Sequence, residues 1–145
     1  MKIGFIGLGN MASAMIGGIL KKNLYSAKNL LGSDKSEAVT QAAAEKFKIH
    51  TTTDNLKVAK EADVLILAVK PQFFQEVIAQ IKDVVSEEQL IISIAPGKTM
   101  EWIMNHFGKE LKLVRCMPNT PALVGEGCTG FCCYKLVKEE EQELA

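Results

Sequence analysis

The chain has 145 residues, enough for one domain that buries roughly two thirds of the surface its unfolded chain would expose. Apolar residues make up 48% and charged residues 23%, which indicates a folded globular domain and excludes a disordered or collagen-like chain. Seventeen basic residues balance seventeen acidic ones, so no net field favours nucleic acid or an anionic membrane as a partner.

Neither a membrane segment nor a zinc site is expected. Glycines interrupt the apolar N-terminal stretch, and no apolar run reaches the roughly 18 residues that would span a bilayer. The cysteines form no CxxC pair, so we expect reduced thiols in a cytoplasmic protein and no metal; they are Cys116, Cys128, Cys132 and Cys133.

The first half of the chain alternates between strand-like and helix-like segments. Short apolar runs predict strands at 2–6, 29–32, 48–51 and 64–69. Apolar residues at helical spacing predict helices at 10–22, 36–46 and 56–61. Ser36 and Asp54 suit the N-caps of the second and third helices, because their side-chain oxygens can accept bonds from free backbone N–H groups. The run 64–69 is continuously apolar, which is typical of a central parallel strand covered on both faces.

The second half continues the alternation. Pro71 suits the opening of a helix, whose predicted buried stripe is Val77, Ile78, Ile81, Val84 and Val85. Thr99 suits the cap of a helix that runs to Phe107, where Gly108 stops it. Further strands are predicted at 90–95, 111–117 and 131–134, and a last helix begins in 137–145.

This order of elements predicts the fold class. Strands that alternate with helices form a parallel sheet through right-handed crossovers. We therefore expect an α/β fold over residues 1–145, with a doubly wound, mostly parallel sheet of the Rossmann dinucleotide-binding type. Its ligand would lie where the strand order reverses, at the carboxyl ends of the first and fourth strands.

A glycine loop follows the first predicted strand and opens the first predicted helix. It reads G-x-G-x-x-A, and no GK[ST] follows that would make it a P-loop. The first glycine allows a tight turn, the second lets a pyrophosphate approach the backbone, and the alanine lets the helix pack closely. The helix N-terminus then faces the phosphates. The residues are Gly7, Leu8, Gly9, Asn10, Met11 and Ala12.

Asp34, at the end of the second predicted strand, bears on the choice between NAD and NADP. An acid here accepts hydrogen bonds from the adenosine ribose, which favours NAD. Ser33, Lys35 and Ser36 flank it and could hold a 2′-phosphate instead, and on these residues we favour NADP. The alternative is that Asp34 and Ser36 only cap the following helix.

Three more loops should line the same crevice. Residues 68–71 and 95–97 end the fourth and fifth strands, and their small residues allow close approach to ribose and nicotinamide. Lys70 could equally be a solvated lysine before a proline. The third loop, 117–122, is stiffened by two prolines, so Asn119 and Thr120 could be held to bond a carboxamide or substrate, or could simply form a turn.

Three segments, IGFIGLGNMASAMIGG, LAVKPQ and RCMPNTPALVGEG, together resemble pyrroline-5-carboxylate reductase. The resemblance implies a Rossmann domain followed by an all-helical domain that builds a dimer and carries a substrate loop. It implies that NADPH or NADH reduces 1-pyrroline-5-carboxylate to proline. The second domain has no counterpart in residues 1–145, so we expect a cofactor-binding fragment of a homo-oligomeric enzyme, itself poorly active.

The resemblance also implies site residues. Asn119 and Thr120 would lie where nicotinamide and substrate meet, and no catalytic acid is assigned. Pro96 departs from the family's Ala-Ala-Gly and removes one N–H donor. With Leu8, Asp34 and Lys35 added from the residue patterns themselves, the predicted cofactor residues are Gly7, Leu8, Gly9, Asn10, Met11, Ser33, Asp34, Lys35, Asn55, Ala68, Val69, Lys70, Pro71, Ala95 and Gly97.

Hydride transfer to a C=N carbon fits the absence of a catalytic triad in the sequence, because the cofactor supplies the chemistry and the protein supplies orientation. Positioning can contribute about 7–11 kcal/mol. His50 and His106 are expected to be structural. Two alternatives stay open: a Rossmann dehydrogenase of the β-hydroxyacid type, against which the MPNTPA loop weighs, and a stand-alone dinucleotide-binding module without turnover.

Overall fold

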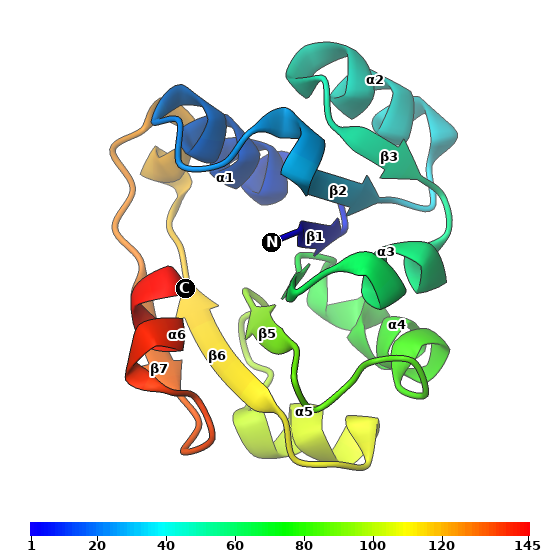
Figure 1. Cartoon of the computed structure of the whole chain (residues 1–145), viewed down its shortest axis with the longest axis vertical. Helices are drawn as coiled ribbons and strands as arrows, with labels where there is room; N and C mark the ends of the chain where they lie inside the picture. The colour runs from blue at the N-terminus through cyan, green and yellow to red at the C-terminus, as the bar shows by residue number, and fades with distance from the viewer.

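A seven-stranded sheet with helices on both faces forms the molecule (Figure 1). The computed structural model describes residues 1–119 and 121–145 in full and the backbone alone of Thr120. The strand order is β3-β2-β1-β4-β5-β6-β7, and every pair is parallel except the antiparallel β6–β7 pair. The predicted doubly wound, mostly parallel α/β fold is confirmed.

The elements follow the predicted order along the chain. The strands are β1 (Ile3–Ile6), β2 (Leu30–Ser33), β3 (His50–Thr52), β4 (Val64–Leu67), β5 (Leu90–Ser93), β6 (Lys112–Met117) and β7 (Gly130–Cys133). The α-helices are α1 (Asn10–Lys21), α2 (Glu37–Phe47), α3 (Asn55–Glu61), α4 (Phe74–Ile81), α5 (Met100–Phe107) and α6 (Glu139–Leu144). Three short 3₁₀ helices are η1 (Ala27–Asn29), η2 (Pro71–Phe73) and η3 (Thr120–Val124).

Side-chain caps fix three helix starts where the sequence predicts them. The backbone N–H of Val39 donates to Ser36 Oγ (3.4 Å), and that of Leu56 donates to Asp54 Oδ1 (2.9 Å). At α5 the N–H of Trp102 donates to Thr99 Oγ1 (3.1 Å). Gly108 ends that helix at φ 73°, a left-handed conformation that glycine adopts without strain.

Several boundaries differ from the predicted ones. The second and third strands start later, at Leu30 and His50, because η1 takes Asn29 and because Lys48 turns left-handed (φ 57°) to end α2. β4 and β5 end two residues early, since the chain leaves the sheet there to form the loops after them. Pro71 opens a 3₁₀ turn before α4, and that helix ends before Val84 and Val85.

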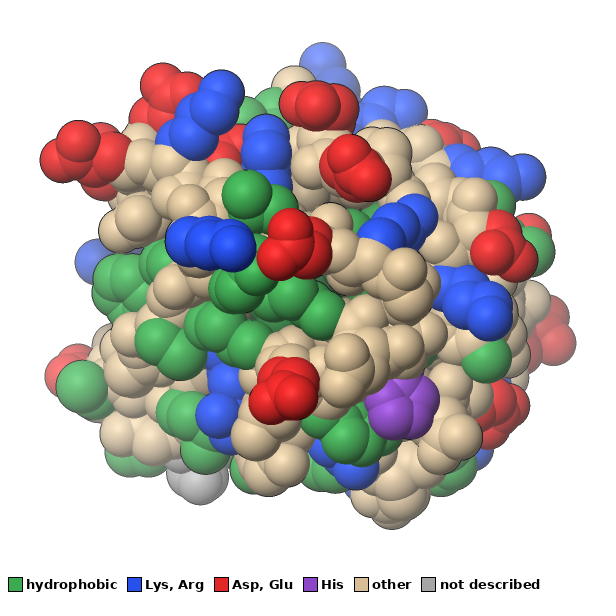
Figure 2. Space-filling view, turned by 90° about the horizontal axis from the view of Figure 1, so that it is seen from below, with side chains coloured by type: hydrophobic (Ala, Val, Ile, Leu, Met, Phe, Trp, Pro, Cys, Tyr) green, Lys and Arg blue, Asp and Glu red, His purple; other side chains and the backbone are tan. Residues whose placement is uncertain are grey.

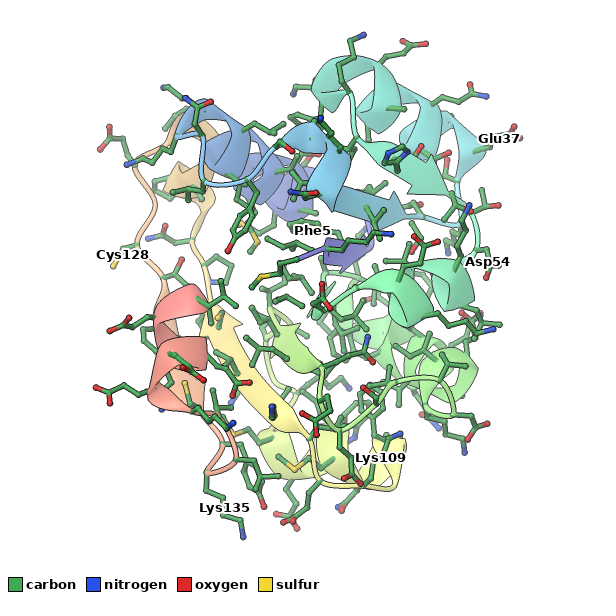
Figure 3. The ribbon with its side chains drawn as sticks, in the orientation of Figure 1. Phe5, Glu37, Asp54, Lys109, Cys128 and Lys135 are labelled. Atoms are coloured by element: carbon green, nitrogen blue, oxygen red, sulfur yellow. The ribbon has the colours of Figure 1, made fainter. Side chains whose placement is uncertain are left out.

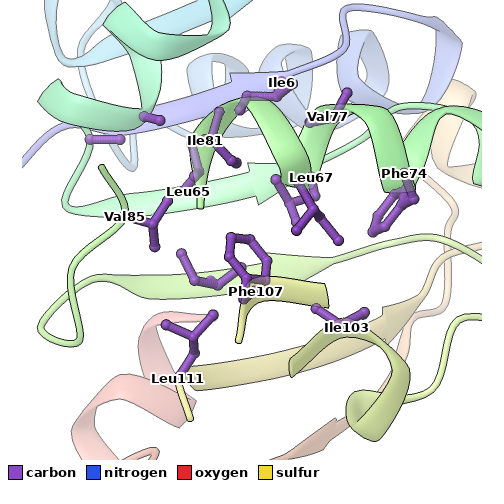
Figure 4. Packing of buried hydrophobic residues seen from close by; sticks show 14 of the residues in the cluster. Ile6, Leu65, Leu67, Phe74, Val77, Ile81, Val85, Ile103, Phe107 and Leu111 are labelled. Carbon is purple, nitrogen blue, oxygen red and sulfur yellow. The ribbon is translucent and has the colours of Figure 1, made fainter. Parts of the chain in front are cut away.

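Two apolar cores lie on the two faces of the sheet. One face packs against α3, α4 and α5, and Figure 4 shows Phe74, Ile81, Ile103 and Phe107 meeting strand residues there. The other face packs against α1 and α2. In Figure 3 Phe5 of β1 lies inside, while charged side chains such as Glu37 lie at the periphery. The sheet is therefore buried on both sides, as a parallel sheet requires.

The surface carries charges of both signs. On the face shown in Figure 2, basic and acidic side chains are interspersed around a group of apolar ones. None of the helices in the described part of the chain is both long and apolar enough to cross a membrane.

Candidate cofactor-binding site

The strand order reverses between β1 and β4, which lie side by side in parallel register. The chain leaves β1 toward α1 on one face and leaves β4 toward α4 on the other, so a crevice opens at the carboxyl ends of these strands. A cavity of about 480 Å³ lies there, a volume typical of small-molecule sites. It is lined by Gly7, Gly9, Asp34, Lys35, Val39, Asn55, Ala68, Val69, Lys70, Phe73, Glu76, Val77 and Gln80.

Gly7 makes the turn out of β1, and only glycine fits there. Its φ is 96°, in the region that other residues adopt with strain. A Cβ atom at this position would lie 2.8 Å from the backbone oxygen of Ala68. The Gly7 N–H donates to the Ser33 carbonyl (2.8 Å), which fixes the turn against β2. The predicted role of Gly7 as a tight-turn glycine is confirmed.

Gly9 leaves the start of α1 open to a ligand. A Cβ atom built on Gly9 would have no other atom within 4 Å, and Gly9 lines the cavity. Unlike α2, α3 and α5, α1 has no capping side chain at its N-cap among the described residues, and no acid lies in its first turn. Free N–H groups and the positive end of the helix dipole suit an anion such as a diphosphate.

Asp34 ties the glycine loop to the end of β2. Its Oδ2 accepts a bond from the Leu8 N–H (3.0 Å), and its Oδ1 accepts one from the Ser36 N–H (3.0 Å). The N-cap of α2 is Ser36 and not Asp34. Charge-assisted bonds of this kind are stronger than neutral ones, so Asp34 holds the loop in place while it also lines the cavity.

The part of the cavity between α2 and α4 combines apolar walls with a polar edge. Val39 and Val77 line it together with Phe73, whose ring lies 3.8 Å below the Lys35 ammonium. A cation over an aromatic face is attracted by the ring quadrupole. Asn55 and Gln80 supply amides at the same cavity. The arrangement can take a flat base between apolar groups and a ribose beside Asp34.

Eight of the predicted cofactor residues line this one cavity: Gly7, Gly9, Asp34, Lys35, Asn55, Ala68, Val69 and Lys70. Ser33 is fully buried and reaches the cavity only through Asn55, to which its hydroxyl donates (2.8 Å). Leu8 is a core residue, and Met11 packs against the core. Asn10 begins α1 and lines a separate cavity between α1 and η3.

Of the residues predicted on the nicotinamide side, those at 68–70 line this cavity, whereas Pro71, Ala95, Gly97 and Asn119 lie outside its lining. Ala95 is buried, and Gly97 turns at φ 75° in open space. Pro71 is the first residue of η2. Asn119 precedes η3, and its Oδ1 accepts a bond from the Cys128 N–H (2.9 Å), which braces the loop. The Thr120 side chain lies outside the described residues. The roles of these residues stay predictions.

Five lining residues were not predicted: Val39, Phe73, Glu76, Val77 and Gln80. The sequence placed Val77 in the buried stripe of its helix, which is also true, since Val77 is buried. The available signal was the position of residues 71–80 directly after β4, at the predicted switch point. Which residues face across the crevice depends on how α4 packs, and the sequence did not show this.

The cysteines lie away from this cavity, on β6 and β7 and the loop before β7. Burial, with smaller contributions from Cys133 and Cys132, raises the pKa of the Cys116 thiol to about 11. Among the described residues no group of three or more His, Cys, Asp or Glu side chains could hold a metal ion.

Comparison with known proteins agrees with this geometry. Residues 2–97 match the family model described as NADP oxidoreductase, coenzyme F420-dependent. The pyrroline-5-carboxylate reductase of Vibrio alginolyticus is 38% identical over 144 residues, which are 99% of this chain and 53% of that protein. The chain thus spans about half the length of the curated relatives it matches.

Two solved structures share the fold closely. A pyrroline-5-carboxylate reductase from Coxiella burnetii superposes with a TM-score of 0.94 at 38% identity, over 99% of this chain and 53% of that one. Plasmodium falciparum pyrroline carboxylate reductase, with NADP bound, gives 0.87 at 33% identity over 99% and 52%. The chain therefore belongs to the NADP oxidoreductase, coenzyme F420-dependent family and corresponds to the NADP-binding domain of the pyrroline-5-carboxylate reductases.

Proposed function

We propose that this chain carries the cofactor-binding part of an enzyme that reduces 1-pyrroline-5-carboxylate to proline with NADPH. The observation that carries the proposal is the glycine loop: Gly9 leaves the uncapped N-terminus of α1 open on a cavity at the switch point of the sheet. The relatives named above support the substrate, and the NADP in the Plasmodium structure supports the cofactor.

When bound, a reduced nicotinamide supplies a hydride to the C=N carbon of the imine. This chain's residues bind and orient. The N–H groups at the start of α1 would hold the diphosphate, and Asp34 would keep that loop in register through the Leu8 N–H. Ala68 and Val69 would flank the ribose at the end of β4. Asn119 and Thr120 remain the proposed contacts on the nicotinamide and substrate side.

Lys35 supports NADPH over NADH. Lys35 lines the cavity, and in the proposed binding mode its ammonium would lie near the 2′-phosphate on the adenosine ribose. Both oxygens of Asp34 already accept backbone bonds, so this carboxylate is less available to a ribose hydroxyl than in an NAD site. We expect NADPH to bind more tightly than NADH.

The rest of the enzyme is part of the proposal. The relatives named above are about twice as long, and we propose that the rest of the enzyme forms a second domain, which completes the substrate site and builds a homo-oligomer in the cytoplasm. Substrate reduction by residues 1–145 alone should then be slow.

Isothermal titration calorimetry of the chain with NADPH and NADH tests the cofactor assignment. We expect saturable binding of NADPH at micromolar to millimolar strength, and weaker binding of NADH. Oxidation of NADPH in the presence of 1-pyrroline-5-carboxylate, compared with a β-hydroxy acid and NADP⁺, tests the substrate. No saturable heat with either dinucleotide would refute the proposal, and turnover of the hydroxy acid alone would favour the other dehydrogenase class.

A further inference from the structure

Two hydrogen bonds connect the buried end of β2 to α4 across the cofactor cavity. Ser33 Oγ donates to Asn55 Oδ1 (2.8 Å), and Asn55 Nδ2 donates to Gln80 Oε1 (2.8 Å). Ser33 is fully buried, whereas Asn55 and Gln80 line the cavity. Because Gln80 Oε1 already accepts one bond, the NH₂ group of Gln80 is the end of this amide with more bonding capacity left for a ligand, as a donor.

The buried Ser33 hydroxyl determines which group donates and which accepts in both bonds. The Ser33 hydroxyl proton needs an acceptor, and Asn55 Oδ1 provides it. If both amides turned over, the buried hydroxyl would lose that acceptor, which is costly for a group without access to water. Bonds that point the same way also polarise one another. The bond from Asn55 therefore occupies the oxygen of the Gln80 amide, and its NH₂ group is the donor that this cavity-lining residue offers.

Glu76 places an acceptor next to this donor. It precedes Gln80 by one turn of α4, so the two side chains are neighbours on one helix face, and both line the cavity. The walls beside them are apolar: Val39, Phe73 and Val77. A flat heteroaromatic ring with a donor next to an acceptor on its edge fits this arrangement. Adenine has such an edge, with its amino group beside a ring nitrogen.

We propose that Gln80 and Glu76 recognise the edge of the adenine base, with Ser33 and Asn55 fixing the Gln80 amide as a donor. The inference rests on the proposed binding of a dinucleotide in this cavity. The Glu76 carboxylate would accept from the adenine amino group, and the Gln80 NH₂ would donate to a ring nitrogen. A 2′-phosphate is a poorer occupant of this edge, since the carboxylate would repel it.

Calorimetry with NADPH and with reduced nicotinamide hypoxanthine dinucleotide phosphate tests the proposal. Hypoxanthine has a carbonyl oxygen in place of the amino group, and that oxygen would face the Glu76 carboxylate. We expect the chain to bind NADPH about tenfold more tightly than the analogue, as one well-formed hydrogen bond allows. Equal affinities would overturn the proposal while dinucleotide binding itself stood. Absence of binding by either would instead refute the proposed function.

Gln80→Glu removes the donor and leaves the bond from Asn55 intact. We expect the affinities for NADPH and for NADH to fall by the same factor, about tenfold. The preference for NADPH over the hypoxanthine analogue should also fall. The matched control is Gln75→Glu, which adds the same charge to an exposed position of α4 outside the lining and should change neither affinity. If the variant bound NADPH more weakly but NADH as tightly as before, Gln80 would contact the 2′-phosphate and not the base, and the proposal would be overturned.

Ser33→Ala tests whether the Ser33 hydroxyl determines which end of the Gln80 amide is offered to the base. The side chain is fully buried, so its effect on base preference would have to pass through Asn55 and Gln80. We expect the tenfold preference for adenine to fall to about threefold while NADPH still binds. Thermal unfolding shows whether the variant is folded. An unchanged preference in folded Ser33→Ala protein would refute the role of the hydrogen-bond chain.

Discussion

Gly9→Val should separate cofactor binding from folding. A Cβ atom at Gly9 has no neighbour within 4 Å, and the backbone there is extended (φ −73°, ψ −166°), so valine fits without clash or strain. The weaker N-cap preference of valine should cost about 1 kcal/mol of stability. The side chain would project into the space that the proposal gives to the diphosphate, in front of the α1 amides. Losing two charge-assisted bonds of about 1.5–3 kcal/mol each raises Kd by roughly two to four powers of ten.

Gly7→Ala, in contrast to Gly9→Val, should lower the stability of the fold. Its Cβ would lie 2.8 Å from three backbone atoms of residues 68–69, at a φ of 96°. Strain of about 1–3 kcal/mol together with the clash should lower the free energy of unfolding by about 2–4 kcal/mol. For a chain of this size, about 3 °C per kcal/mol then lowers Tm by roughly 6–12 °C.

Calorimetry with NADPH and thermal unfolding by circular dichroism measure the two effects. Gly18→Val is the matched control, because Gly18 also has open space at its Cβ but lies on α1 outside the cofactor cavity. It should leave NADPH affinity unchanged. Full affinity in Gly9→Val protein would show that the diphosphate does not lie over this loop, and unfolding of that variant would contradict the open space around Gly9.

Three further outcomes are expected. Asp34→Ala should lower the free energy of unfolding by about 2 kcal/mol and weaken NADPH binding, because two backbone N–H groups lose a charged acceptor; urea unfolding with calorimetry measures both, and unchanged values would contradict the loop-holding role. Burial by itself raises the pKa of the Glu141 carboxyl. The bonds that this carboxylate accepts from the Lys138 N–H and the Lys112 ammonium together lower the pKa by more than burial raises it, so the net pKa lies below the ordinary 4.5. The stability from this shift is present above pH 4.5 and is lost as pH falls through the lowered pKa, so Lys112→Met should flatten the fall in Tm between about pH 5 and pH 3. Iodoacetamide at pH 8 should label exposed Cys128 and spare Cys116, whose thiol has a pKa of about 11, as peptide mass spectrometry can show; equal labelling would contradict its burial.

Local patterns in the sequence were sufficient for the order of elements and for the glycine turn after β1. Gly7 makes the predicted tight turn and Gly9 leaves the start of α1 open, because both features depend on residues adjacent in the chain. The same holds for the caps Ser36, Asp54 and Thr99. The strand ends at Leu67 and Ser93 were less predictable, since apolar composition continues past the point where the chain leaves the sheet.

The function of Asp34 shows what local patterns leave open. The sequence allowed a ribose acceptor or a helix cap, and the structure gives the carboxylate a bond to the Leu8 N–H, 26 positions away in the chain. Such a bond exists only because β1 and β2 are paired in register. No spacing rule within one element predicts it.

By itself the sequence determined the alternation of strands and helices, the glycine loop and the place of the crevice at the carboxyl ends of β1 and β4. These follow from backbone sterics and hydrophobic periodicity, which act over a few residues. Only the tertiary structure decided which side of α4 faces the crevice, and so which residues join Asn55 at the cavity. That orientation depends on packing between α3 and α4 in one core. Contacts between residues far apart in the chain cannot be predicted from the pattern of any single segment.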